Sequence, residues 1–123
     1  MKYDNLIQRK SYAFAVRVVR LYQHLCAVKK EYVLSKQLLR CGTSIGANIE
    51  EAVGAQSRAD FVSKLSVAYK EARETSYWIR ILNDTGYLTH VQFDSIQADS
   101  NELCRILVSI LKSTKSGASA IKN

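Results

Sequence analysis

Few side chains in this 123-residue sequence have the spacing that metal binding or acid–base catalysis requires. The histidines His24 and His90 would each need a glutamate three residues earlier to form the di-iron motif of helical bundles. Leu21 and Tyr87 occupy those positions. The sequence also contains neither a glycine-rich phosphate loop nor a nucleophile-elbow motif. We therefore expect no metal, no cofactor and no enzymatic activity.

One pair of carboxylates, Glu71 and Glu74, lies a helical turn apart. Such a pair could act as an acid and a base. Lys70 and Arg73 flank it, however, so we expect the two glutamates to form ion pairs, either in solvent or at an interface.

Basic residues are concentrated near the start of the chain. The sequence has 18 Lys and Arg against 11 Asp and Glu, a net charge of +7, and residues 1–30 hold seven basic residues and one acidic residue. On a helix, five of these basic residues fall within an arc of about 100°, opposite the apolar stripe. They are Lys2, Arg9, Lys10, Arg17 and Arg20.

A run of charge is most often a solvated face, and that interpretation stays open here. Ordinary solvated faces mix positive and negative residues, because mixed signs allow ion pairs four residues apart. This face contains no acid. Clustered positive charge is typical of surfaces that contact phosphates, so the pattern predicts weakly sequence-specific contact with the backbone of RNA or DNA.

Positioning these residues requires long helices. The sequence has no Pro and only five Gly, and apolar residues recur at spacings of three and four. The pattern predicts helices over about residues 5–28 and 35–55. A third helix begins behind the capping signal Ser57/Asp60 and ends before Gly86, and a fourth follows the capping box Thr89/Gln92.

The connections between these helices are short, which favours antiparallel neighbours. We expect an all-α protein, an antiparallel up-and-down four-helix bundle that occupies residues 1–115. Residues 116–123 are rich in Ser, Ala and Gly, and we expect them to form a disordered C-terminal tail.

Two helix faces carry apolar residues away from the predicted core stripes. A wide apolar arc inside one bundle would explain them. We favour a subunit interface, because a tryptophan outside the core is typical of an association surface and glycines allow close backbone approach. The predicted interface residues are Leu39, Gly42, Gly46, Val53, Val67, Glu71, Glu74, Trp78 and Ile81.

Asn48 lies on the apolar stripe of the second helix, so its amide needs a hydrogen-bond partner. We expect a structural role, with Asn48 bonding across the bundle. Ser44, one turn earlier, is expected to bond its own helix or to join that network.

Three cysteines, Cys26, Cys41 and Cys104, replace apolar residues in helical patterns and lack the spacing of a metal site. We interpret them as buried thiols in a reducing compartment. No apolar run approaches the roughly 20 residues that span a membrane, and no signal-peptide pattern is present at the start. We therefore expect a soluble cytoplasmic protein without membrane contact.

A longer pattern begins at Gln37-Leu38-Leu39-Arg40-Cys41, Ser44-Ile45, Asn48-Ile49 and Glu51. It continues through Gly54, Phe61, Leu65, Ala68, Glu71, Ala72-Arg73-Glu74-Thr75, Trp78, Gly86-Tyr87-Leu88, Glu102-Leu103 and Ile106-Leu107. This pattern resembles the four helix bundle protein family, also called the ribosomal RNA intervening-sequence protein family, over roughly residues 5–115.

The resemblance implies a left-handed bundle that assembles as a ring, typically a homopentamer. Relatives of that family include the accessory variability protein of diversity-generating retroelements, a basic pentamer that binds nucleic acid and a reverse transcriptase. Two hypotheses follow. The chain is a non-enzymatic homo-oligomer that holds RNA or DNA through its cationic faces, or it is a structural adaptor whose partner is another protein, such as a reverse transcriptase.

Overall fold

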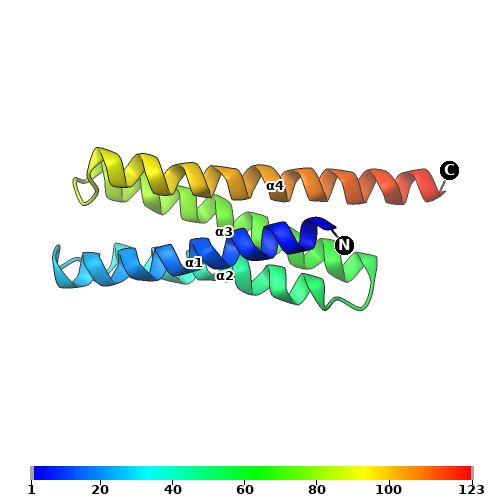
Figure 1. Ribbon diagram of the computed structural model, residues 1–123, viewed down its shortest axis with the longest axis horizontal. Coiled ribbons are helices and arrows are strands. Elements are labelled where there is room, and N and C mark those ends of the chain that lie inside the picture. The colour runs from blue at the N-terminus through cyan, green and yellow to red at the C-terminus, as the bar shows by residue number, and fades with distance from the viewer. Residues whose placement is uncertain (1, 123) are drawn as a thin grey trace.

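Four helices form the structure, a computed structural model that describes the backbone of residues 2–122 and the side chains of residues 6–115. They are α1 (Lys2–Ala27), α2 (Leu34–Val53), α3 (Arg58–Asp84) and α4 (His90–Lys122). Each helix runs antiparallel to the one before it, and α3 crosses obliquely between the α1–α2 pair and α4 (Figure 1). The predicted all-α up-and-down four-helix bundle is confirmed.

Helices that follow one another in the chain pack together, and α4 also packs against α1. The seam between α1 and α4 is the least extensive of the four. The tail predicted at residues 116–123 lies outside the side chains that the structure describes, so it stays a prediction. Ring assembly is likewise a prediction, since it concerns several copies of the chain.

The capping signals define the starts of α3 and α4. The Ser57 hydroxyl accepts a hydrogen bond from the backbone N–H of Asp60 at 3.1 Å. Thr89 and Gln92 bond each other reciprocally: the Thr89 hydroxyl accepts from the Gln92 N–H at 3.1 Å, and the Gln92 side chain accepts from the Thr89 N–H at 2.9 Å. Gly86 follows α3 with φ of 86°, a backbone conformation that suits glycine. The predicted boundaries are confirmed at these positions.

The start of α2 has a cap that the sequence pattern did not indicate. Glu31 is only 8% exposed. Its carboxylate accepts hydrogen bonds from the backbone N–H groups of Val33, Leu34 and Ser35, at 2.9, 3.1 and 2.7 Å. The first N–H groups of a helix have no acceptor within the helix, and this carboxylate accepts hydrogen bonds from three of them. Its negative charge also lies at the positive end of the helix dipole, where it is stabilising.

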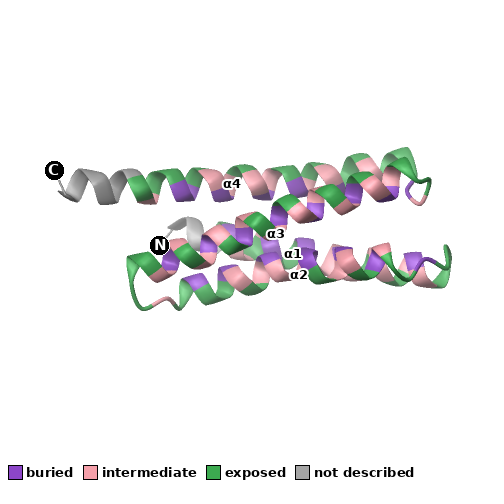
Figure 2. Ribbon diagram, turned by 180° about the vertical axis from the view of Figure 1, so that it is seen from behind, coloured by how far each residue is buried: buried purple, intermediate pink, exposed green. Residues whose placement is uncertain are grey.

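The hydrophobic core runs along the middle of the bundle. Each helix contributes one buried stripe, seen from behind in Figure 2 as purple segments that alternate with exposed ones. The stripes include Phe14, Leu38, Leu65 and Leu107, each no more than 2% exposed. Burying one such side chain contributes roughly 1.5–3 kcal/mol. Packing of these stripes therefore holds the four helices together.

Within the described part of the chain, no helix combines the length and the apolar character that crossing a membrane demands. The same residues contain no group of three or more His, Cys, Asp or Glu side chains that could hold a metal ion.

Candidate nucleic-acid interface

The basic face predicted on α1 divides into two rows. Arg9 and Arg20 are exposed, and they form the outer row. Lys10 and Arg17 form the inner row and are only part-exposed, because they lie against α4. Lys2 belongs to α1, but its side chain lies outside those the structure describes.

The inner row is neutralised by acids of α4. Lys10 Nζ lies 3.1 Å from Glu102 Oε1, and Arg17 Nη1 lies 2.5 Å from Asp99 Oδ2. Arg17 also donates to the Ser95 hydroxyl at 2.9 Å. These two ion pairs correct the prediction of a face without acids. A helical projection of α1 does not show the acidic residues that α4 places beside it. Both pairs are more than a third exposed, so each contributes at most about 1 kcal/mol to stability.

Two of the predicted interface residues lie between α1 and α2 of the same chain. Gly42 is buried, and a Cβ atom at this position would approach the Val18 side chain to 2.8 Å. A Cβ atom at Gly46 would lie 3.5 Å from the Ser11 carbonyl oxygen. The prediction of a subunit interface at Gly42 is therefore corrected, because Gly42 allows two helices of one chain to approach each other.

The α3 residues predicted at the interface lie on the opposite flank of α2. Arg40 of α2 pairs with both Glu71, at 3.7 Å, and Glu74. The indole N–H of Trp78 donates to the same Glu74 carboxylate at 3.0 Å. Trp78 packs partly against the core and makes an edge contact with Tyr77 at 5.2 Å between ring centres. The expected ion pairing of Glu71 and Glu74 is thus present within the chain.

The remaining predicted interface residues are apolar and reach solvent. Val53 is 44% exposed and Val67 is 37% exposed, while Leu39 and Ile81 are partly buried. Leu39 and Val53 lie on α2, and Val67 and Ile81 lie on α3. Their role in assembly stays a prediction.

The two polar residues predicted to be structural form bonds only within α2. Asn48 donates to the Ser44 carbonyl at 2.9 Å, and the Ser44 hydroxyl donates to the Arg40 carbonyl at 2.7 Å. The predicted bond from Asn48 across the bundle is wrong for the described residues, because the amide nitrogen donates instead to the carbonyl one turn earlier. The bond that Ser44 makes to its own helix was one of the two expected arrangements.

The cysteines are free thiols with different degrees of burial. Cys41 is buried, as predicted, and burial raises the pKa of its thiol above the ordinary value of 9.0. Cys26 and Cys104 are half-buried, so the interpretation of all three as buried thiols is wrong for these two.

Two surfaces were not predicted. The outer side of α1 carries a strip formed by Tyr12, Ala15, Val16 and Val19, in which Tyr12 is 71% exposed. The outer sides of α3 and α4 carry exposed basic residues, which include Lys70, Arg73, Arg80, Arg105, Lys112 and Lys115. Basic residues and acids are interspersed along α3, whereas in α4 the acids precede Arg105 and the basic residues that follow it.

The geometry defines a small basic protein built as a single all-α bundle, with several exposed cationic surfaces. The sequence matches the 23S rRNA-intervening sequence protein family over residues 3–109, and the chain belongs to that family. A similar fold is found in a crystal structure of a protein of unknown function from the S23 ribosomal protein family of Bacteroides thetaiotaomicron. The two chains are 56% identical, with a TM-score of 0.88 over 91% of this chain and 99% of the other. No curated protein matches the sequence.

Proposed function

We propose that this chain is a non-enzymatic, homo-oligomeric protein of the cytoplasm that binds RNA or DNA through its exposed cationic surfaces. The observation that carries the proposal is the unequal use of charge inside the bundle. Five of the ten acidic residues among residues 6–115 form ion pairs within the chain. Among residues 6–115, only four basic side chains form ion pairs.

Pairing within the chain therefore neutralises half of the described acids and leaves most basic groups facing solvent. Because each ion pair removes charge of both signs, such pairing leaves the net charge of +7 unchanged. Exposed Lys and Arg displace the counterions that surround nucleic acid, and the release of those ions is the main source of non-specific affinity. On α1 the contact residues in this proposal are Arg9 and Arg20, together with Lys2, while Lys10 and Arg17 position α1 against α4.

We also propose assembly into a ring, the homopentamer that the family resemblance implies. A ring requires two different complementary surfaces on each subunit. The apolar strip of α1 is one candidate, and the predicted surface around Val67 and Trp78 of α3 is another. Five copies would repeat each cationic surface around the ring, and repeated contacts raise the overall affinity without any new interaction.

A matched pair of variants tests the nucleic-acid proposal. Arg9→Ala/Arg20→Ala and Lys10→Ala/Arg17→Ala each remove two positive charges from the same helix. Fluorescence anisotropy of labelled duplex DNA and structured RNA would be measured across a salt series, with folding checked by circular dichroism. We expect the outer-row variant to bind more weakly, with a salt slope reduced by about one for each phosphate that it no longer neutralises. The inner-row variant should lose clearly less affinity.

An equal decrease of affinity in the two variants would show that only total charge matters and would reject Arg9 and Arg20 as a contact site. If the wild-type chain binds neither nucleic acid at moderate salt, the proposal fails.

The alternative function, an adaptor for another protein, is favoured by one observation. The strip Tyr12, Ala15, Val16 and Val19 borders a shallow depression that also includes Arg20 and Gln23. An apolar surface bordered by a cation suits a protein partner that carries an acidic group. Binding that depends on Tyr12 and is retained without nucleic acid would support this function.

A further inference from the structure

The α3–α4 surface differs in charge from the rest of the bundle because several acids of both helices pair with other helices. Glu71 and Glu74 of α3 pair with α2, and Asp99 and Glu102 of α4 pair with α1. Among the described side chains, seven basic residues of α3 and α4 are exposed and form no ion pair with any described acid: Arg58, Lys70, Arg73, Arg80, Arg105, Lys112 and Lys115. The acids of these two helices without an ion pair to a described residue are Asp60, Asp84 and Asp94, so unpaired basic residues outnumber unpaired acids on α3 and α4.

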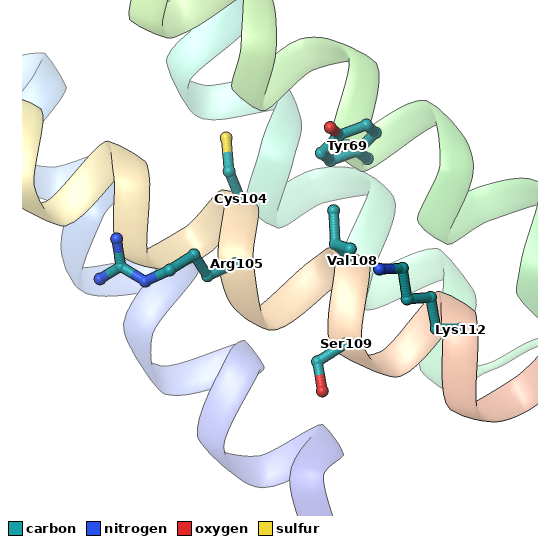
Figure 3. A pocket seen from close by; sticks show the side chains of 6 residues that line it. All are labelled: Tyr69, Cys104, Arg105, Val108, Ser109 and Lys112. Atoms are coloured by element: carbon teal, nitrogen blue, oxygen red, sulfur yellow. The ribbon is translucent and has the colours of Figure 1, made fainter.

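A shallow pocket of about 500 Å³ lies on this surface. Tyr69 of α3 lines one side, and the remaining lining residues belong to α4: Cys104, Arg105, Val108, Ser109 and Lys112. Figure 3 shows that Val108 and the ammonium group of Lys112 are the α4 groups nearer to the Tyr69 ring. Arg105 and Ser109 lie farther from this ring. The volume is within the range of small-ligand sites in proteins, about 300–1,000 Å³.

Cys104, which lines the pocket, has positively charged neighbours on both helices. The charged groups close enough to influence the Cys104 thiol are Arg73 of α3 and Arg105 of α4, and both are positive. Burial is nevertheless the larger influence and raises the pKa of the thiol. Lys112 and Val108 thus lie near the Tyr69 ring, Arg105 lies farther from the ring on the same helix, and Arg73 of α3 is close enough to influence the Cys104 thiol.

We propose that this pocket binds one unpaired nucleotide of a single-stranded nucleic acid. The base would contact Tyr69 and Val108, and the adjacent phosphates would lie between Arg105, Lys112 and Arg73. Aromatic rings bind bases by stacking regardless of sequence, while Lys and Arg hold the backbone. The bases of a duplex are already stacked, so the pocket selects single strands.

This inference rests on the proposed function for the class of ligand, but it concerns a different surface. An acidic peptide would contact the cations but would not require the aromatic ring. The effect of removing the Tyr69 ring on binding therefore distinguishes a nucleotide from an acidic peptide.

The experiment compares two tyrosine variants. Tyr69→Leu removes the ring from the pocket, and Tyr32→Leu removes an exposed ring from the connection between α1 and α2 as the matched control. Tyr69→Phe retains the ring and should preserve binding. The probes are a labelled oligouridylate, a labelled duplex of equal length and polyglutamate, each measured by anisotropy on the whole chain. We expect Tyr69→Leu to weaken binding of the oligouridylate about tenfold, with duplex affinity unchanged.

The cysteines provide a second measurement that does not depend on a substitution. Cys104 lines the pocket, whereas Cys26 is also half-buried but lies on α1. Alkylation of each thiol would be followed by mass spectrometry with and without the oligouridylate. We expect the oligouridylate to slow modification of Cys104 and to leave Cys26 unchanged.

One outcome is that the oligouridylate binds without protecting Cys104 and that Tyr69→Leu binds it as tightly as the wild type does. That result would overturn the proposed nucleotide site in the pocket, while the proposed function would stand. Equal protection of Cys104 by polyglutamate would also overturn it, in favour of an acidic protein ligand. Absence of binding to both nucleic acids would overturn the proposed function together with the pocket.

Discussion

Replacing each of two glycines in α2 by alanine gives a quantitative test of how α1 and α2 pack. Gly42→Ala places a Cβ atom 2.8 Å from Val18 Cγ2 and 2.9 Å from Val18 Cγ1. Valine is branched at Cβ and stiff, and Val18 is fully buried, so it cannot rotate away freely. Gly46→Ala places a Cβ atom 3.5 Å from the nearest atom of Ser11, which is an ordinary contact distance.

Both substitutions improve helix propensity by roughly 1 kcal/mol, because glycine is a poor helix former. Only Gly42→Ala also overpacks the core, at a cost of about 1–3 kcal/mol. We therefore expect Gly46→Ala to stabilise the chain by up to about 1 kcal/mol. Gly42→Ala should be less stable than Gly46→Ala by about 1–3 kcal/mol, since the propensity gain cancels in the comparison.

The free energy of unfolding would be measured by urea titration at one fixed protein concentration, because assembly would otherwise shift the apparent stability. The double variant Gly42→Ala/Val18→Ala should be more stable than the sum of the two single effects implies, since the smaller side chain removes the clash. Equal stability of Gly42→Ala and Gly46→Ala would refute this close packing of α2 against Val18. Sedimentation of Gly46→Ala would additionally show whether this glycine contributes to a subunit interface.

Three other side chains can each be tested by a single substitution. Glu31→Ala should reduce the free energy of unfolding by about 1–2 kcal/mol, because three N–H groups at the start of α2 then lack their acceptor; an unchanged urea midpoint would contradict the capping role. Stability should fall as pH rises above about 9.0, because the raised pKa of Cys41 keeps its thiol protonated in the folded chain after the unfolded chain ionises. In Cys41→Ser, which should itself be slightly less stable, this decline should be smaller, and an identical pH profile would exclude the thiol as its source. Trp78→Ala should weaken assembly by about 2 kcal/mol if Trp78 is an interface anchor; sedimentation showing unchanged mass at micromolar concentration would assign Trp78 to packing within the subunit.

The sequence alone determined the fold class of this protein. The periodicity of apolar residues defined four helices, and the capping signals at Ser57 and Thr89 placed the starts of α3 and α4 correctly. These features are local, since each depends on residues three or four positions apart. They can therefore be recognised in the sequence without knowledge of the tertiary structure. The Glu31 cap was missed because its glutamate precedes α2 by three residues, whereas the expected signals place Ser, Thr, Asp or Asn next to the first turn.

Only the tertiary structure decided which charges are available to a ligand. In the sequence, α1 is the most one-sided helix, yet Lys10 and Arg17 are paired with acids that lie more than 80 positions away along the chain. Conversely, α3 mixes both signs in sequence and α4 carries its acids before its basic residues. Four acids of these two helices pair with neighbouring helices, while most of their basic residues face solvent. A pair of charges interacts according to its separation in space, and that separation is fixed by helix packing. The helix pattern was local and could be predicted, whereas the cationic surfaces depend on contacts between helices.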